Sequence, residues 1–473
     1  MPVGSLISEQ IRGLSPASYI VYTDGSKYYA KNGSTGIIEY SDVDATKVIQ
    51  YAVNNAPSGG LVLIKAGTYN ITDTITINKS LRLLGEGFGT VLKATDKLNG
   101  SPYGKEMIFV SGTERVEIAY MSFIGIGTAD TNPEAIHTFI SKHVFVHHSY
   151  FYNLGGAYGG IDFSNSPMSI ASDNIIDTVK FGIALSGTWN EYDIVVRNNI
   201  IMNAVFGMHC EFPWRSVIEG NIIINFSSRG INIDGSYNNV GRIIISDNVL
   251  YSEQNATGIY LGNGISQYGY AKNILIANNF ISTASSEGIH IGDNNENIRI
   301  VANIFIGLPN SVNAINISGV SNNIEVLDNL FTGYSYGVTV NSNVSNLIVR
   351  NNRINTSNGV FVSAGGVANG LIVEGNKFES QYPYYYYGSV SNAIVKRNIG
   401  YLTENSGVAT IPAGSTRVTV SHGLTVTPSK ILITPLAQPP GKLWVENITS
   451  TSFDIVTDTA PASNLNVSWC AEV

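Results

Sequence analysis

Carboxylate, imidazole and guanidinium side chains gather in one stretch of this chain, residues 207–234. Glu211 and Asp234 take equivalent places in two successive copies of a short repeated phrase, and His209 and Arg229 stand nearby in the sequence. Stacked carboxylates repel each other, so one of them tends to keep its proton near neutral pH. A proton donor beside an ionised partner is what hydrolysis of a glycosidic bond requires. We therefore predict Glu211 and Asp234 as the catalytic pair, assisted by His209 and Arg229.

A second set of residues could hold a sugar chain beside these groups. Aromatic rings with a polar tip pack against sugar faces, and carboxylates and amides bond to hydroxyl groups. The predicted substrate-binding residues are Asp162, Trp189, Trp214, Asn232, Tyr260, Glu287 and His290. An outward acidic pair such as Glu211 and Asp234 is also typical of solvated surface or of a cation site, so these two residues also fit a surface without chemistry.

Three histidines, His143, His147 and His148, lie close enough in sequence to suggest a metal site. They alternate with valines in a strand-like pattern and need not share a face. We therefore predict no metal site and no required cofactor. Ca²⁺ is the ion to consider if the reaction is that of a lyase.

Two repeated phrases indicate the elements that must position these side chains. One is a small residue followed by an aliphatic, a variable and another aliphatic residue, and the other is an Asn followed by apolar residues. Both series step by 22 to 31 residues, a period that indicates a solenoid. The first phrase begins at Gly160, Gly182, Gly207, Gly230, Gly258, Gly288, Ala314, Gly337 and Gly359, and the second at Asn174, Asn199, Asn221, Asn248, Asn279, Asn303, Asn329, Asn352, Asn376 and Asn398.

Alternation of apolar residues within each repeat predicts strands rather than helices, as in Ile243-Ile245 and Leu347-Val349. A right-handed parallel β-helix of about twelve coils fits this pattern, with coils roughly 4.8 Å apart. Buried Asn side chains would bond to their counterparts in neighbouring coils. The glycines mark corners that need either positive φ or close approach of the backbone. In the glycine phrase the second and fourth residues would point inward, and the third and fifth outward.

The remaining segments have a different pattern. Residues 1–40 predict strands and a hairpin, and residues 41–60 an amphipathic helix with Asp44 as N-cap that would cover the first coil. The β-helix would occupy residues 61–403. Short alternating strands in residues 404–473 predict a small antiparallel β-sandwich. The fold class is therefore all-β, with one capping helix.

The stretch from Asp44 to Gly87 resembles the opening of the pectate-lyase-like (pectin lyase fold) superfamily, which many viral tailspikes share. The matching motifs are Asp44-Ala45-Thr46-Lys47-Val48-Ile49-Gln50, Gly59-Gly60, Lys65-Ala66-Gly67-Thr68-Tyr69 and Leu84-Gly85-Glu86-Gly87. The C-terminal segment resembles small β-domains of phage tail proteins. These resemblances imply a right-handed β-helix and a carbohydrate ligand, but they leave the reaction open. Where polygalacturonases of the superfamily carry Gly-His-Gly, this chain has Ser228-Arg229-Gly230 and Ser286-Glu287-Gly288.

Composition narrows the possible partners. Charged residues make up 13% of the chain and the net charge is −8, which disfavours nucleic acid as a partner. The first residues lack the basic and apolar regions of a secretory signal, and no apolar stretch is long enough to enter a membrane. We expect an extracellular or virion-surface location, reached by a trimmed form or as part of a virus particle.

Two functions of different kinds follow from these observations. The chain could cleave a polysaccharide as a glycoside hydrolase or polysaccharide lyase, or it could be a non-catalytic spike or adhesin that recognises surface glycans. We favour a tailspike-like, carbohydrate-active protein. A homotrimer is expected because a long flank rich in Tyr and Ile and poor in charge offers a surface to bury.

Overall fold

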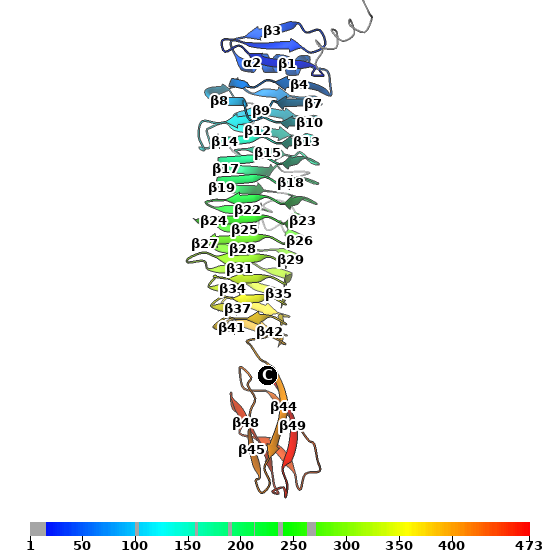
Figure 1. Ribbon diagram of the computed structural model, residues 1–473, viewed down its shortest axis with the longest axis vertical. Helices are drawn as coiled ribbons and strands as arrows, with labels where there is room; N and C mark the ends of the chain where they lie inside the picture. Colours follow the sequence, from blue (N-terminus) through cyan, green and yellow to red (C-terminus); the bar gives the residue numbers. More distant parts are fainter. Residues whose placement is uncertain are drawn as a thin grey trace, which may run out of the picture.

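The computed structural model describes residues 16–99, 104–156, 159–187, 192–211, 213–234, 240–262 and 271–473. Short parallel strands stack into a long rod, and a smaller antiparallel unit follows at its C-terminal end (Figure 1). The predicted fold class is confirmed, because the residues in these ranges are nearly all β, with about twelve β-helix turns, one short helix and small antiparallel sheets at the C-terminus. Among the described residues, no helix has the length and hydropathy to cross a bilayer.

The N-terminal cap closes the first coil. Strands β1 (Tyr19–Thr23), β2 (Tyr28–Asn32) and β3 (Ile38–Asp42) pair antiparallel, and β1 also pairs parallel with the first strand of the β-helix. Helix α2 (Ala45–Asn55) begins where expected, since the Asp44 carboxylate accepts a hydrogen bond from the Thr46 N–H at 3.0 Å. Its apolar face, which includes Val48 and Ile49, is buried in the core that continues through the β-helix.

Three ladders of parallel strands form the β-helix. The first ladder contains β4 (Gly60–Ile64), β7 (Leu81–Gly85), β10 (Glu114–Ala119), β13 (Lys142–His147), β16 (Ile170–Ser172), β18 (Val195–Arg197), β20 (Val217–Glu219), β23 (Val240–Ser246), β26 (Ala271–Ala277), β29 (Asn295–Val301), β32 (Ser321–Leu327), β35 (Asn343–Arg350), β38 (Val367–Asn369), β39 (Ile372–Glu374), β42 (Ser389–Ser391) and β43 (Ile394–Lys396).

The second ladder contains β5 (Gly67–Asp73), β8 (Thr90–Asn99), β11 (Ser122–Ile124), β14 (Tyr150–Leu154), the first halves of β17 (Ile175–Ser186) and β19 (Ile200–Cys210), β21 (Ile222–Ile224), β24 (Val249–Asn255), β27 (Phe280–Ala284), β30 (Ile304–Gly307), β33 (Leu330–Thr332), β36 (Arg353–Asn355) and β40 (Lys377–Phe378).

The third ladder contains β6 (Ile75–Ile77), β9 (Glu106–Ser111), β12 (Glu134–Phe139), β15 (Ile161–Ser164), the second halves of β17 and β19, β22 (Arg229–Asp234), β25 (Thr257–Gly262), β28 (Glu287–Ile291), β31 (Asn313–Ile317), β34 (Tyr336–Val340), β37 (Asn358–Val362) and β41 (Tyr382–Tyr386).

The predicted asparagine series forms an unbroken buried ladder from Asn174 to Asn398. At each step the side-chain amide donates to the Oδ1 of the next asparagine at 3.0–3.1 Å. The same amide also donates to a main-chain carbonyl of the preceding coil, as Asn248 does to Ile218. Each asparagine therefore satisfies buried groups of neighbouring coils.

The glycine corner serves close approach of the backbone rather than positive φ. A Cβ on Gly258 would lie 2.6 Å from the carbonyl oxygen of Gly288, and one on Gly230 would lie 2.7 Å from that of Gly258. None of the glycines of the repeated phrase has positive φ. Their role is to let one coil pack on the next.

The C-terminal unit consists of two three-stranded antiparallel sheets. One contains β44 (Glu404–Ile411), β49 (Leu465–Glu472) and β46 (Lys430–Pro435), and the other contains β45 (Arg417–Ser421), β48 (Ser452–Thr457) and β47 (Leu443–Glu446). A separate core that includes Phe453 and Trp469 joins them. The two cysteines are free, with Cys210 buried in the β-helix core and Cys470 part-buried on β49.

Candidate functional site

The third residues of the glycine phrase form one column on the outside of the third ladder, which we call the outer column. Strand pairing places its members in register, one per coil, while their aliphatic neighbours lie in the core. The predicted inward and outward alternation is therefore correct. From β9 to β34 the column reads Phe109, His137, Asp162, Ala184, His209, Asn232, Tyr260, His290, Asn316 and Thr339.

The outer column is not a solvated surface. Asp162 and Asn232 are each 1% exposed, and His137 is 7% exposed. Their polar groups bond to side chains of adjacent coils, as Asp162 does to Ser186 and Asn232 to His209. A polar column of this kind is held in fixed geometry, as a site that orients a ligand requires.

A chain of polar contacts leads to Glu211. The Arg229 guanidinium donates to the Oδ1 of Asn232, whose amide donates to Nδ1 of His209 at 2.8 Å. His209 therefore carries its ring proton on Nε2, which faces Glu211 at 3.5 Å. The Glu211 carboxylate also accepts a hydrogen bond from the Gly187 N–H at 3.2 Å. These contacts orient Glu211 at the surface, where its side chain is 25% exposed.

Both faces of the Tyr260 ring are covered. The Arg229 guanidinium carbon lies 3.4 Å from the ring centroid, and the His290 ring stacks on Tyr260 at 4.5 Å. A sugar ring therefore has no free face of Tyr260 to stack on. The stack instead fixes Arg229 and His290 on either side of Tyr260, in the coils before and after it.

His290 and Glu287 form a second polar group, one coil beyond Tyr260. Nδ1 of His290 bonds to the Glu287 carboxylate at 2.6 Å, and its Nε2 bonds to the Ser318 hydroxyl at 2.8 Å. The Asn316 amide donates to the other Glu287 oxygen at 2.6 Å. Glu287 and His290 keep side-chain exposures of 18% and 19%, so they can reach a ligand.

The remaining predicted residues are more scattered. Asp234 ends β22 and is part-exposed, and because Cys210 pairs with Ile233, Asp234 follows Glu211 in the next coil. Trp214 lies at the corner before the first ladder, with Arg242 over its ring at 5.6 Å, and does not join the outer column. Trp189 lies outside the described residues.

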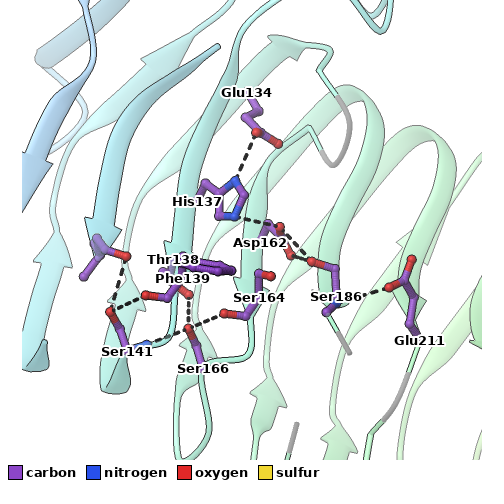
Figure 2. Close-up of polar contacts among 12 residues, drawn as sticks. Glu134, His137, Thr138, Phe139, Ser141, Asp162, Ser164, Ser166, Ser186 and Glu211 are labelled. Atoms are coloured by element: carbon purple, nitrogen blue, oxygen red, sulfur yellow. Dashed lines mark hydrogen bonds and ion pairs between the residues drawn. The ribbon is translucent and has the colours of Figure 1, made fainter. Parts of the chain in front are cut away.

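A buried group at the N-terminal end of the column centres on His137 (Figure 2). Its Nδ1 lies 3.4 Å from a Glu134 oxygen and its Nε2 lies 3.7 Å from an Asp162 oxygen. Glu106 pairs in register with Glu134 in the coil before it. The Ser186 hydroxyl contacts both Asp162 oxygens, at 2.7 and 2.9 Å.

Burial and charge act on this group in opposite directions. Burial raises the pKa of Asp162 to about 7, although the charge of His137 lowers it. Burial alone would lower the pKa of His137, but the contact with Glu134 and the charges of Asp162, Glu134 and Glu106 outweigh it and raise that pKa to about 9. The surroundings therefore favour positive charge at this position.

Sequence reasoning missed Glu106, Glu134 and His137. The predicted repeats begin at Gly160, and Ala135-Ile136-His137-Thr138 departs from the phrase only at its fourth position, where Thr138 stands in place of an aliphatic residue. Accepting Thr at that position would have placed His137 in the outer column. Nothing in the sequence marks Glu106 or Glu134, which precede the inward positions of their strands.

The three histidines of β13 and the turn after it do not form one cluster. His147 and His148 bond through their Nδ1 atoms at 2.8 Å, and His147 also contacts Glu117 at 3.2 Å. His143 is exposed at the other end of the strand.

Comparison with known proteins agrees with this architecture. Residues 107–262 match a family described as "Periplasmic copper-binding protein (NosD)". No curated protein sequence matches the chain. The structure is similar to that of the Dettilon tailspike protein, with 14% identity, a TM-score of 0.55 and 91% of each chain covered. It is also similar to the tailspike protein of E. coli bacteriophage HK620 in complex with a pentasaccharide, with 12% identity, a TM-score of 0.58, and 91% of this chain and 90% of that chain covered.

The chain thus has the pectate-lyase-like parallel β-helix fold, and phage tailspikes are among its structural neighbours. The fold predicted from the opening motifs is confirmed. At these identities the likeness concerns the fold, and the function must be argued from the site.

Proposed function

We propose that this chain is a tailspike-like, carbohydrate-active protein that binds a polysaccharide along the third ladder and hydrolyses it. The observation that carries the proposal is the chain of polar contacts from Arg229 through Asn232 and His209 to the part-exposed Glu211: two hydrogen bonds followed by a 3.5 Å contact between His209 and the Glu211 carboxylate. A surface without chemistry has no need of a carboxylate that is oriented by side chains of its own coil and of the next one. The pentasaccharide complex of a structural neighbour supports a glycan as the ligand.

Glu211 suits the anionic role, because the Gly187 N–H and His209 stabilise its charge. Asp234, which follows it in the next coil, would donate the proton. Adjacent coils are about 4.8 Å apart, and carboxyl groups roughly 5 Å apart favour a retaining mechanism. Glu211 then attacks the anomeric carbon while Asp234 protonates the leaving oxygen. Water next displaces Glu211 from the sugar and returns a proton to Asp234. The net reaction consumes one molecule of water for each glycosidic bond that is cleaved.

The part-exposed Glu287 and His290 would hold the sugar on the C-terminal side of this pair. Their oxygens and ring nitrogens can exchange hydrogen bonds with hydroxyl groups, and Asn316 and Ser318 keep them oriented. Arg229, whose guanidinium stacks on the Tyr260 ring, would place a positive charge near Glu211.

The test is incubation of the pure protein with a panel of neutral and acidic polysaccharides, with and without Ca²⁺. New reducing ends without the ultraviolet absorbance of an unsaturated sugar would support hydrolysis. Reducing ends with that absorbance would mean a lyase and would overturn the mechanism. Binding without either signal would mean a non-catalytic receptor-binding spike.

The variants Glu211→Gln and Asp234→Asn test the residues. Loss of a catalytic acid or base lowers rates by about 10²–10⁴-fold, so each variant should lose cleavage while still binding the glycan. Glu325→Gln is the matched control, since Glu325 pairs with Arg299 on the first ladder, away from the site. Equal activity in all three variants would remove this assignment.

We also propose that the protein assembles as a homotrimer through the second ladder. Eight stacked apolar residues form one outward column on this ladder, which we call the aliphatic column, and Ile222, Val249 and Ile304 in it are 38%, 37% and 42% exposed. A continuous apolar strip of this length is typical of a protein interface. The same column on a second copy would match its coil spacing. Its members are Tyr150, Ile175, Ile200, Ile222, Val249, Phe280, Ile304 and Leu330.

An extracellular or virion-surface location is part of the same proposal. The low charged fraction and the fold shared with phage tailspikes support it. Copper binding, which the description of the matching family names, is not part of it. Cu⁺ prefers sulfur ligands, and Cys210, Met208 and Met107 lie in the apolar core.

A further inference from the structure

Ligand atoms of Glu106, Glu134 and His137 lie within 4.8 Å of one another, and all three residues are buried. Glu106 and Glu134 are the first residues of β9 and β12 and pair in register, so their carboxylates come from neighbouring coils. His137 belongs to the same strand as Glu134, three residues further on. No polymer can reach atoms buried to this degree, so a ligand must be as small as a single ion.

The distance between His137 and Glu134 is closer to the separation of two ligand atoms on one metal ion than to the length of a hydrogen bond. Charge-assisted N–H···O bonds measure about 2.7–2.9 Å, whereas Nδ1 of His137 lies 3.4 Å from Glu134. Imidazole and carboxylate ligands each lie about 2.0–2.2 Å from Zn²⁺ in tetrahedral geometry. Two such ligands are therefore roughly 3.4 Å apart.

A glycine makes room for this convergence. A Cβ on Gly104 would lie 3.2 Å from Oε1 of Glu134 and 3.3 Å from Oε2 of Glu106. Both carboxylates therefore point to one spot beside the Gly104 backbone, and a larger residue there would fill the space between them.

The second ring nitrogen of His137 faces residues that hold the imidazole in place. Histidine ligands usually direct their second ring nitrogen to a carboxylate, which fixes the ring. Nε2 of His137 faces Asp162 at 3.7 Å, and the Ser186 hydroxyl in turn holds Asp162 (Figure 2). Asp162 and Ser186 come from the next two coils, so the arrangement spans four successive coils.

We propose that Glu106, Glu134 and His137 form a buried site for one divalent cation of the Zn²⁺ or Mn²⁺ class, with Asp162 as the positioning residue of the histidine. Two carboxylates and one imidazole are ligands of that class, and Ca²⁺ prefers oxygen ligands alone. The cation joins β9 to β12 and stabilises the folded β-helix, because it binds the folded chain and not the separated strands.

The experiment needs no glycan, so its outcome is independent of the proposed hydrolysis. Full-length protein is stripped with a chelator and dialysed against ZnCl₂, MnCl₂ or CaCl₂, and bound metal is counted by mass spectrometry and titrated by calorimetry. We expect one Zn²⁺ per chain, weaker Ca²⁺ binding, and a thermal midpoint that rises with the Zn²⁺ concentration. No bound metal, or Ca²⁺ bound more tightly than Zn²⁺, would overturn the assignment.

Variants locate the site. His137→Gln and Glu134→Gln should abolish stoichiometric binding, and Asp162→Asn should weaken it by about 10–100-fold. His143→Gln is the matched control, because His143 is an exposed histidine of the neighbouring strand β13. Circular dichroism first checks that each variant is folded. If His137→Gln is unfolded, the metal site is tested by Asp162→Asn and by the preference of the unmodified chain for Zn²⁺. Unchanged binding in a folded His137→Gln or Asp162→Asn protein would exclude these residues.

Discussion

At the scale of single residues, Asn232 illustrates how an outward side chain acquires a role other than contact with solvent. It is buried, receives a hydrogen bond from Arg229 and donates one to Nδ1 of His209. It therefore determines which nitrogen of His209 carries the proton that faces Glu211. Under the proposed mechanism Asn232 acts through His209 as a positioning residue.

Asn232→Leu is expected to lower kcat by about 10–100-fold, the usual effect of losing an orienting partner, with a smaller change in KM. Without the amide, His209 can adopt the other tautomer and its Nε2–H no longer faces Glu211. Steady-state kinetics across a pH range would measure kcat and KM. Asn232→Gln, which keeps an amide donor, should retain more activity than Asn232→Asp, which has none. A change confined to thermal stability would mean that Asn232 serves the fold alone.

The asparagine ladder gives a second prediction for a single residue. Asn248→Ala removes the donor to the Ile218 carbonyl and the acceptor for Asn221, both buried. Buried polar groups left without partners each cost about 1–3 kcal/mol. A clear fall in the thermal midpoint is therefore expected, measured by calorimetry. Asn355→Ala, at an exposed position of β36, serves as the control and should unfold like the unmodified chain.

At the scale of elements, the glycine corner explains how strands β22, β25 and β28 reach their spacing. The carbonyl of each glycine occupies the space where a Cβ of the preceding one would lie. Ala314 shows that one coil accommodates a methyl group at this corner. A branched side chain needs more room than that.

Gly258→Val should therefore destabilise the β-helix by about 1–3 kcal/mol or more, as overpacking does. The added atoms would meet the Gly288 carbonyl at 2.6 Å and the Ile281 side chain at 2.7 Å. Gly89→Val is a fair comparison, since a Cβ there meets only Ala66, at 3.6 Å. Equal thermal midpoints for the two variants would argue against close packing at the corner.

The C-terminal sheets contain a buried carboxylate that makes their stability depend on pH. Hydrogen bonds from Thr419 and Asn447, and the charge of Arg417, lower the pKa of Asp454. A pKa that is lower in the folded state stabilises the fold above the ordinary value of about 3.9. That contribution is lost as the pH falls through the folded pKa.

Acidification from pH 7 to pH 3 should therefore lower the melting temperature of this part of the chain. Asp454→Asn should lower it already at pH 7 and flatten its dependence on pH, because the charged acceptor of Arg417 is gone. Calorimetry of the full chain at several pH values would show this. A pH profile that is the same in variant and parent would assign the effect to other groups.

At the scale of the whole molecule, the three ladders divide the surface by chemistry. The third ladder holds the polar outer column, and the second holds the aliphatic column that continues through consecutive coils. Beyond Leu330 that column changes to Arg353 and Lys377. The apolar strip is therefore limited to the middle of the rod, as expected of a defined contact region.

The double variant Ile222→Lys/Ile304→Lys should shift the protein from trimer to monomer. Lysines placed on facing copies of the column would repel each other and would be costly to bury. Light scattering after gel filtration measures the mass, and Ile244→Lys on the first ladder is the control, since Ile244 is equally exposed. A monomeric parent protein, or a variant that stays trimeric, would rule out this interface.

Sequence alone determined the repeat, because stacked coils impose the same inward positions and the same asparagine and glycine corners on every turn. The Asn ladder and the register of Asp162, His209 and Asn232 followed from that periodicity, and the N-cap at Asp44 followed from the amphipathic pattern of the helix after it. Local rules of this kind need only the spacing of residues along the chain.

Only the tertiary structure decided which outward residues face solvent and which are covered. Burial of Asp162, coverage of both faces of Tyr260, and convergence of Glu106, Glu134 and His137 depend on side chains from several coils. The sequence of a single repeat does not show how side chains of neighbouring coils pack against it. The repeat therefore placed these residues on a face of the β-helix, and contacts between coils determined what each of them can bind.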